Sequence, residues 1–258
     1  MKAGEKGFTL IEILFAILIG LILISVCYIA MTSGQQTSAG VERKVAAQQD
    51  VRAAMQVMGL ELSMASYNPH YMPNIWHDLP SLGNLVQCQG SGNQAYKGIR
   101  EATPTAITVE MDVGESNLVG DERGEIIRYA YDPENQYLTR ETANCNQTRN
   151  ASAAAPFLGD NPNAIARRPR TVRVNNQNPG NPAQNIVNPQ GYVAVFRYFD
   201  AHHPAMELFP TLADPSPIPN IRRIDITLAV ETDEVDPASK RRRQMIYSTT
   251  VLVRNHVF

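Results

Sequence analysis

Gly7-Phe8-Thr9-Leu10-Ile11-Glu12 opens an almost uninterrupted apolar run that continues to Ala30. The apolar core from Phe8 to Met31 has about 24 residues and, as a helix, would measure about 36 Å. A helix of that length crosses a hydrocarbon core of about 30 Å with some tilt. Because an unpaired acid at the centre of a span costs roughly 3 kcal/mol, Glu12 is expected to have a function. The stretch therefore predicts a membrane-spanning helix that carries one functional carboxylate.

A short charged leader precedes this run. Its cations Lys2 and Lys6 outnumber its single acid, Glu5. Positive charge beside a span favours the cytoplasmic side, so the N-terminus is expected in the cytoplasm. Everything from about Thr32 onward then lies on the far side of the membrane.

Three other kinds of N-terminal segment fit these residues less well. A cleaved secretory signal needs a small-residue cleavage site after its apolar core. A lipoprotein signal would centre on Cys27, but Val26 is too large for the residue before a lipidated cysteine. An ordinary signal anchor explains neither Glu12 nor the Gly7-Phe8 junction.

Residues 1 to about 30 resemble the type III signal of type IV prepilins and pseudopilins. The resemblance implies a leader peptide at 1–7, cut by a prepilin peptidase between Gly7 and Phe8, and N-methylation of the new Phe8 amino group. That amine is mostly cationic at neutral pH, because an α-amino group has a pKa near 8. Glu12 could pair with the amine of its own helix, one turn away. The family's role for this acid, subunit assembly, implies a pair with a neighbouring subunit.

The helix is expected to continue well beyond the membrane. Residues 8–31 form its transmembrane half and residues 32–65 an amphipathic half, which together run to near Leu62 over about 80 Å. Charged residues fill the other faces, and Gly34 and Gly40 weaken the middle by up to ~1 kcal/mol each. The apolar residues of the second half recur at spacings near three and four: Val41, Val45, Val51, Met55, Met58 and Leu62.

Residues 66–258 are expected to form a periplasmic, globular, β-rich domain. The chain of 258 residues is 43% apolar and 19% charged, which is typical of a globular protein. Residues 69–104 are predicted to form a loop, and a long polar surface insertion is expected at about 143–190. Alternating runs predict strands, with a hairpin between the second and third: Ile107–Val113, Ile126–Tyr131, Tyr137–Arg140, Tyr192–Phe199, Arg223–Val230 and Met245–Arg254.

The three cysteines lie in different parts of the chain and have different expected roles. Cys27 lies in the apolar run and is expected to be a small buried side chain. Cys88 and Cys145 fall in the exported part, where the compartment is oxidising, and a disulfide between them is expected. Such a bridge would close a loop of nearly 60 residues and contribute on the order of 4 kcal/mol.

No catalytic or cofactor motif is found in the sequence. It contains no glycine-rich phosphate loop, no nucleophile elbow and no His/Cys cluster with metal spacing, so we expect neither an enzyme nor a cofactor or metal. His70 and His77 are read as solvent-exposed loop residues. The one basic run, 240–243, follows three acids and is expected in a solvated hairpin loop. With a formal net charge of −2, the chain has no bulk basic charge that would favour nucleic acid as a partner.

Two stretches near the C-terminus indicate a more specific resemblance within this family. Residues 223–228 and 247–255 look like the C-terminal strand pair of PilW-type minor pilins and of the related GspJ-type minor pseudopilins. The hairpin around Tyr129 and Tyr131 is similar to their central sheet. The helix lacks the proline that many major pilins carry near the membrane exit, which fits a specialised low-copy subunit, as the 143–190 insertion does.

Sequence and resemblance together predict an α+β fold of pilin-like architecture, in which a long N-terminal helix packs on an antiparallel β-sheet. The expected function is structural: a minor pilin of a type IV pilus that helps to prime or cap filament assembly. The alternatives are a minor pseudopilin of a type II secretion system and an adhesive or DNA-uptake minor pilin; a membrane-anchored enzyme ranks last. The implied partners are prepilin peptidase, other minor and major pilins, a tip adhesin and the inner membrane.

Overall fold

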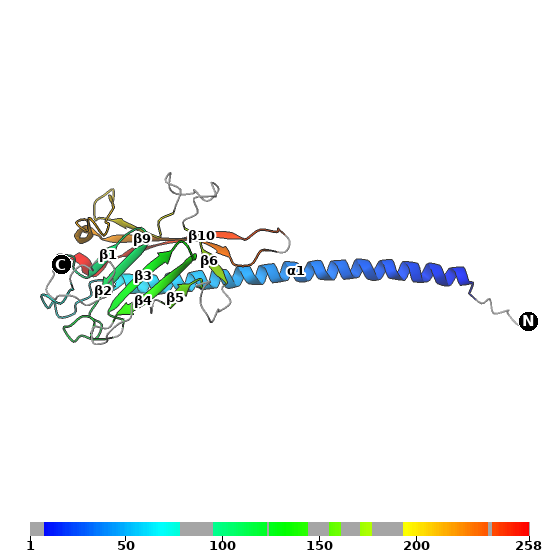
Figure 1. The fold of residues 1–258 in the computed structure, drawn as a ribbon, viewed down its shortest axis with the longest axis horizontal. Helices are drawn as coiled ribbons and strands as arrows, with labels where there is room; N and C mark the ends of the chain where they lie inside the picture. The colour runs from blue at the N-terminus through cyan, green and yellow to red at the C-terminus, as the bar shows by residue number, and fades with distance from the viewer. Residues whose placement is uncertain are drawn as a thin grey trace, which may run out of the picture.

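The computed structural model of the chain describes residues 8–77, 95–122, 124–143, 155–160, 171–176, 193–236 and 239–257. These residues form one long α-helix, α1, and ten strands in two antiparallel sheets. Figure 1 shows half of α1 projecting from a β-rich domain that packs around its other half. The predicted α+β, pilin-like arrangement is confirmed.

Helix α1 runs from Leu10 to Ser63, 54 residues in all. At 1.5 Å per residue it measures about 81 Å, in agreement with the predicted length. No proline occurs within it, so its hydrogen-bond ladder is uninterrupted. It ends at Met64, whose backbone N–H donates to the carbonyl groups of Glu61 and Leu62.

The first sheet is a meander in which each strand pairs with the next along the chain, in the order β1-β2-β3-β4-β5. The predicted hairpin is confirmed as β3–β4, with register from Ile126↔Ala143 to Asp132↔Tyr137. Asp132 closes its turn by accepting the backbone N–H groups of Glu134 and Asn135. The strands of this sheet are β1 (Ile99–Ala102), β2 (Ala106–Glu110), β3 (Ile126–Asp132), β4 (Tyr137–Ala143) and β5 (Ala155–Leu158).

The second sheet has the order β10-β9-β7-β8, and β6 also pairs with β9. Its longest strand, β9, alternates between buried and partly buried residues along its whole length, as its sequence predicts. Two short 3₁₀ helices, η3 (Ile218–Asn220) and η4 (Arg254–Val257), lie near its end. The strands are β6 (Val172–Val174), β7 (Phe196–Phe199), β8 (Glu207–Leu208), β9 (Arg223–Thr232) and β10 (Gln244–Leu252).

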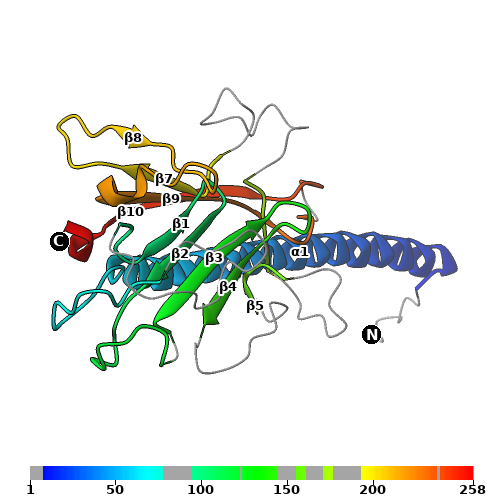
Figure 2. The same ribbon diagram turned by 60° about the vertical axis from the view of Figure 1, so that its left-hand side comes forward.

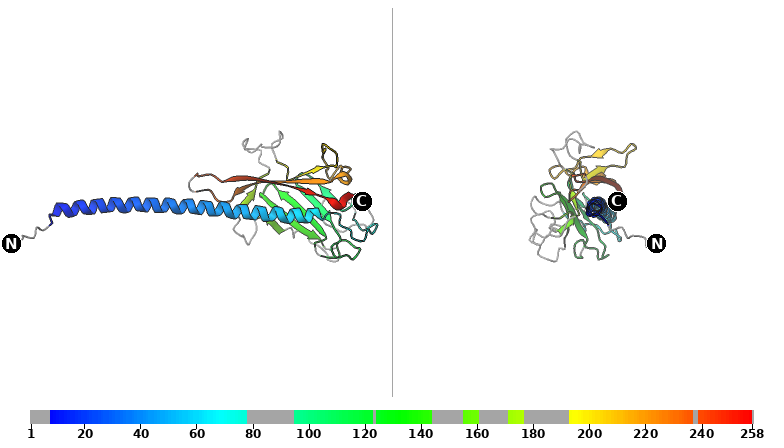
Figure 3. Two further views of the ribbon diagram at one scale, coloured as in Figure 1. Left: turned by 180° about the vertical axis from the view of Figure 1, so that it is seen from behind. Right: turned by 90° about the vertical axis from the view of Figure 1, so that its right-hand side faces the viewer.

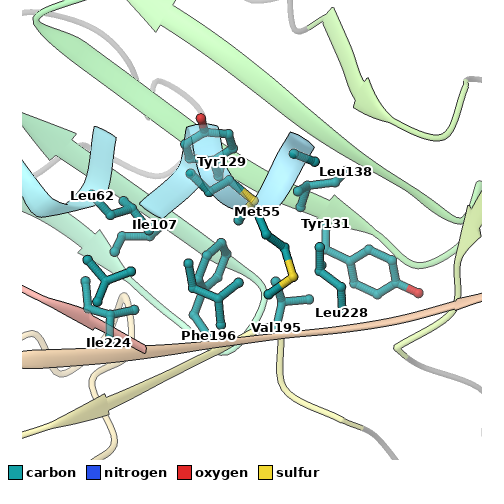
Figure 4. Close-up of a cluster of buried hydrophobic side chains, with 14 of the residues drawn as sticks. Met55, Leu62, Ile107, Tyr129, Tyr131, Leu138, Val195, Phe196, Ile224 and Leu228 are labelled. Carbon is teal, nitrogen blue, oxygen red and sulfur yellow. The ribbon is translucent and has the colours of Figure 1, made fainter. Parts of the chain in front are cut away.

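The hydrophobic core lies where α1 passes between the two sheets, an arrangement that Figures 2 and 3 show from further sides. Met55 and Leu62 point from α1 into this core in Figure 4. Gly40 is buried, and from Ala47 onward apolar side chains of the helix enter the core, whereas Val41 and Val45, at 55% and 43% exposed, stay outside it. From the first sheet the core takes Ile107, Tyr129, Tyr131 and Leu138, and from the second Val195, Phe196, Ile224 and Leu228.

Two parts of the sequence prediction are wrong in the described residues. The expected loop at 69–104 contains β1, all four of whose residues are buried. The expected surface insertion at 143–190 supplies β5 and β6, and Leu158, Val172 and Val174 from it are core residues. Strands of three or four residues carry little local signal, because their stability comes from the strands beside them. The strands also divide between two sheets, where one had been expected.

Candidate functional site

A reciprocal capping box between Thr9 and Glu12 closes the first turn of α1. The backbone N–H of Thr9 donates to Glu12 Oε2 at 2.8 Å, and the Thr9 hydroxyl donates to the same oxygen at 2.9 Å. The backbone N–H of Glu12 donates to Thr9 Oγ1 at 3.4 Å. The box satisfies N–H groups that the helix ladder leaves free, and it holds a carboxylate at the positive end of the helix dipole. The local sequence thus starts the helix at Leu10.

The Glu12 carboxylate retains one unused oxygen. Both bonds from Thr9 end on Oε2, and Oε1 accepts none from the residues that the structure describes. Phe8 lies directly before the cap and is 85% exposed. Glu12 can therefore keep its cap with one oxygen and offer the other to an ammonium group. An ammonium of its own chain and one of a neighbouring subunit are both compatible with this geometry.

The first half of α1 is an exposed apolar surface. Its large side chains from Leu10 to Ile29 are 52–78% exposed, and nothing in the described protein packs against them. This helix is long and apolar enough to cross a membrane, and none of its most apolar window is buried. A surface of this size is unfavourable in water at about 25 cal/mol per Å², so it needs lipid or other helices around it.

A serine and a threonine hydroxyl along this half bond to their own helix. Ser25 Oγ donates to the carbonyl of Leu21 at 2.8 Å. Thr32 Oγ1 donates to the carbonyls of Tyr28 and Ile29, both at 3.0 Å. These bonds let the hydroxyls enter an apolar environment without an outside partner. Glu12 is then the one ionised side chain from Phe8 to Met31.

Residues 2–28 match the family described as the prokaryotic N-terminal methylation motif. The matched range includes the Gly7-Phe8 junction, the capping box and most of the apolar run. This motif is the signal of type IV pilins and pseudopilins. It indicates a type IV pilin-like or pseudopilin protein. No curated protein and no solved structure matches the chain.

The motif accounts for part of the predicted site. It implies processing by a prepilin peptidase and assembly with pilins in general. Phe8 and Glu12 are brought together at the helix start, whereas Gly7 lies outside the described residues. Cys88 and Cys145 lie outside them too, so their disulfide stays a prediction that non-reducing mass analysis would test. Cys27 is exposed on the apolar half of α1, not buried as expected.

In the docked half of this pilin-like chain, a charged cluster ties α1 to the first sheet. Arg140 on β4 donates to Glu61 on α1 through Nε at 3.0 Å and through Nη2 at 2.5 Å. The Tyr129 hydroxyl donates to Glu61 as well. Burial, and then the Glu61 carboxylate, raise the pKa of Tyr129 well above its ordinary value. The cluster sets the helix position on the sheet, and sequence reasoning missed it because its members are 79 residues apart.

A serine–histidine pair lies beyond the end of α1. Ser66 Oγ lies 2.8 Å from His256 Nδ1, and both side chains are buried. The His256 nitrogens also contact the carbonyl oxygens of Lys97 and Ile218, each at 3.0 Å. Burial lowers the pKa of His256 to about 4. The ring and the serine hydroxyl are buried among these carbonyl groups, and the pair acts as a tie between the C-terminus and the end of α1.

The two loop histidines, His70 and His77, differ in their exposure to solvent. His70 is exposed, as expected, and contacts Asn117 at 3.1 Å. His77 is mostly buried: its Nδ1 lies 3.0 Å from Glu110 Oε1 and its backbone N–H donates to Glu110 Oε2 at 3.1 Å. The prediction of an exposed His77 is therefore wrong, because His77 binds the buried Glu110 carboxylate of β2. Among the described residues no group of three potential ligands could hold a metal ion.

Proposed function

We propose that this chain is a minor pilin of a type IV pilus, a structural subunit that helps to prime or cap filament assembly. The observation that carries the proposal is the division of α1. Its second half, from Gly40, packs against the domain, and its first half is an apolar rod with an acid in the first turn. A rod of this kind has no use within its own chain. It is built for a partner outside it.

The apolar rod suits two environments in turn. Before assembly it would lie in the inner membrane, with the N-terminus cytoplasmic and the domain periplasmic. In a filament, the same surface would pack against the helices of other subunits. Lipid tails and apolar helices are similar as solvents, so the transfer between them exposes little apolar surface to water. Extraction of the subunit therefore need not overcome the full cost of hydrating the rod.

Glu12 would fix the position of the subunit along its neighbours in the filament. A rod covered only by apolar contacts can slide along its neighbours, whereas a buried ion pair is satisfied at one position. Removing one partner of such a pair typically costs 3–5 kcal/mol. A methylated Phe8 amine from a neighbouring subunit fits this role, since it remains charged and Glu12 Oε1 is available to it. Correct stacking is then the arrangement in which no charge is left unpaired.

The role we propose is structural and not catalytic. The buried Ser66–His256 pair is held by carbonyl groups, and the Glu61 cluster is used in docking α1. Energy for assembly would come from a separate ATPase. The low-copy assignment rests on the helix without proline and on the extra strands from 143–190, β5 and β6, which add one strand to each sheet.

A minor pseudopilin of a type II secretion system is the second candidate, because the same motif directs both kinds of filament. The test is a deletion strain complemented with wild type or with Glu12→Ala. Sheared surface pili and secreted proteins are assayed side by side. Lost pili with normal secretion supports the minor-pilin function. Lost secretion with normal pili assigns the chain to secretion, and loss of neither removes the filament function.

A further inference from the structure

The β9–β10 hairpin carries charged residues at its turn, at 233–236 and 239–243, and we call these residues the hairpin tip. Figures 1 and 3 show the hairpin extending beyond the rest of the domain, alongside α1 and toward its N-terminal half. The turn is closed by backbone bonds, from the N–H of Asp236 to the carbonyl of Arg241 and from the N–H of Lys240 to the carbonyl of Asp236. These bonds do not involve the side chains of Lys240 and Arg241, so replacing those two side chains leaves them in place.

Contacts at two levels fix the direction of the hairpin along the helix. At its base, Val251 lies beside Gly59, with 4.0 Å between the valine Cγ2 and the position that a Cβ would take. At its tip, Asp236 lies against Gly40, where a Cβ would be 3.3 Å from Oδ1. Glu234 also pairs with Arg43 at 2.7 Å. The hairpin thus follows α1 downward, from Gly59 to Gly40, toward the apolar rod.

The tip consequently lies close to the expected membrane surface. The apolar run ends at Met31, and the nine residues to Gly40 span about 14 Å of helix. The headgroup layer occupies roughly 5–8 Å of that distance. What remains is about one Debye length at physiological ionic strength, which is ~8 Å. Charges at the tip are therefore within electrostatic range of lipid headgroups, and the usual tilt of a span would bring one face nearer.

The charges at the tip do not cancel. Of its three carboxylates, Asp236 accepts from Arg243 at 2.9 Å, while the other two pair with arginines outside the run. Asp233 forms an ion pair with Arg173, and Glu234 forms one with Arg43. The tip itself holds four cationic side chains and three carboxylates, and two of those carboxylates also pair with an arginine from outside it. The cations are Lys240, Arg241, Arg242 and Arg243, and the carboxylates are Asp233, Glu234 and Asp236.

Two basic side chains and one apolar side chain are presented outward. Lys240 and Arg241 are exposed, whereas Arg242 donates to the carbonyl of Asp233. Val235, also at the tip, is 45% exposed. Basic residues with an adjacent apolar side chain are the composition that binds anionic membrane surfaces. We propose that the hairpin tip binds the anionic headgroups of the membrane that α1 spans, and so holds the domain against the bilayer before assembly.

The test uses the full chain in nanodiscs of phosphatidylcholine alone or with 30% phosphatidylglycerol, each containing a lipid with a photoactivatable headgroup. Crosslinked peptides are mapped by mass spectrometry. We expect crosslinks at 235–243 that are strong in the anionic discs and are lost at high salt. Replacing Lys240→Asn together with Arg241→Gln should lower their yield at least fivefold, since one basic residue near such a surface contributes roughly 1 kcal/mol. Asparagine suits position 240 because φ there is +55°.

A charge-matched control is Arg52→Gln with Arg254→Gln. Both arginines are exposed and away from the tip: Arg52 is twelve residues, about 18 Å, beyond Gly40 on α1, and Arg254 follows the end of β10. The control should leave the crosslinks unchanged. Equal crosslinking in neutral and anionic discs, or equal loss in the control, overturns the proposal. So does binding of duplex DNA that is lost in the tip variant while lipid crosslinks persist, because the tip would then be a nucleic-acid site.

The inference depends on α1 spanning the membrane and not on the kind of filament. A chain that fails to enter the nanodisc would contradict the span, and with it the proposed function. A chain that enters but shows no headgroup crosslinks at the tip would contradict only the inference. The two failures are therefore distinguishable in one preparation.

Discussion

Glu61 of α1 and Arg140 of β4 face each other through two parallel hydrogen bonds, Nε to Oε2 at 3.0 Å and Nη2 to Oε1 at 2.5 Å. Two-pronged pairs between arginine and carboxylate are among the stronger charged contacts, because their geometry is fixed as well as their charge. The pair joins the end of the long helix to the centre of the first sheet. It therefore determines how the projecting rod is oriented on the domain.

Replacing Arg140→Ala should lower the free energy of unfolding by about 2 kcal/mol, because Glu61 would keep its charge with only the neutral Tyr129 hydroxyl as a partner. The value is placed below that of a fully buried pair, since the two side chains are 29% and 21% exposed. Denaturant unfolding of the full chain in detergent measures it. Arg43→Ala, which removes an exposed pair between α1 and Glu234, should cost less than 1 kcal/mol. Equal losses would show that the Glu61 pair does not hold the helix.

His256 should make the protein acid-sensitive. Its folded pKa is about 4, below the ordinary value of 6.5, so the folded state favours the neutral ring. The unfolded chain binds a proton below pH 6.5, and stability is lost as the pH falls from 6.5 toward 4. Between pH 7 and pH 4.5 this group should remove about 2.5 kcal/mol.

The measurement is urea unfolding at these two pH values. His256→Asn should be less stable at pH 7 but lose less on acidification, because asparagine does not titrate. The comparison of the two slopes isolates His256 from the carboxylates that titrate in the same range. An unchanged slope in the variant would assign the acid sensitivity to those carboxylates.

Glu12 has two roles that a pair of variants can separate. Glu12→Gln keeps an oxygen that can accept from Thr9, so the capping box survives, but it loses the charge. Glu12→Ala loses both. We expect both variants to insert into the membrane and both to be depleted severalfold from sheared filaments, as measured by immunoblot of the two fractions. Normal incorporation of Glu12→Gln would mean that the cap matters and the charge pair does not.

Insertion of both variants is expected because the apolar run far outweighs the acid. Residues 8–31 contain 15 leucine, isoleucine, phenylalanine and valine residues. At roughly 0.3–0.6 kcal/mol each, they favour the membrane by about 5–9 kcal/mol, against about 3 for one central acid. Carbonate extraction of the membrane fraction tests this.

Gly40 should be required for the close approach of the hairpin tip. Gly40→Leu would place a side chain where Asp236 Oδ1 lies 3.3 Å from the added Cβ, so the tip should move off the helix and the Arg43–Glu234 pair should open. Trypsin cleavage in the basic run 240–243 should then become faster. Gly34→Leu is the matched control, because nothing lies within 4 Å of its Cβ position. Equal cleavage rates in both variants would contradict this packing.

The long helix, its apolar first half and the hairpin β3–β4 can all be predicted from local sequence. Each depends on residues that are neighbours in the chain: the cap of Thr9 and Glu12, the absence of proline, and the side-chain alternation on either side of a short turn. Such signals arise from backbone geometry and from contact with solvent, and they act over a few residues. Glu12 stands out in the sequence for the same reason, as a charge among apolar neighbours.

Which strands share a sheet, how α1 lies between the two sheets, and which charges pair depend on the folded arrangement of the whole chain. Short β5 and β6 are strands because neighbouring strands offer them hydrogen bonds, and Glu61 finds Arg140 across 79 residues. The hairpin tip is a further example. In the sequence its acids nearly balance its bases, but in the folded protein Asp233 pairs with Arg173 and Glu234 with Arg43. Contacts between distant residues exist only after the chain has closed the loops between them, and no local pattern records that choice.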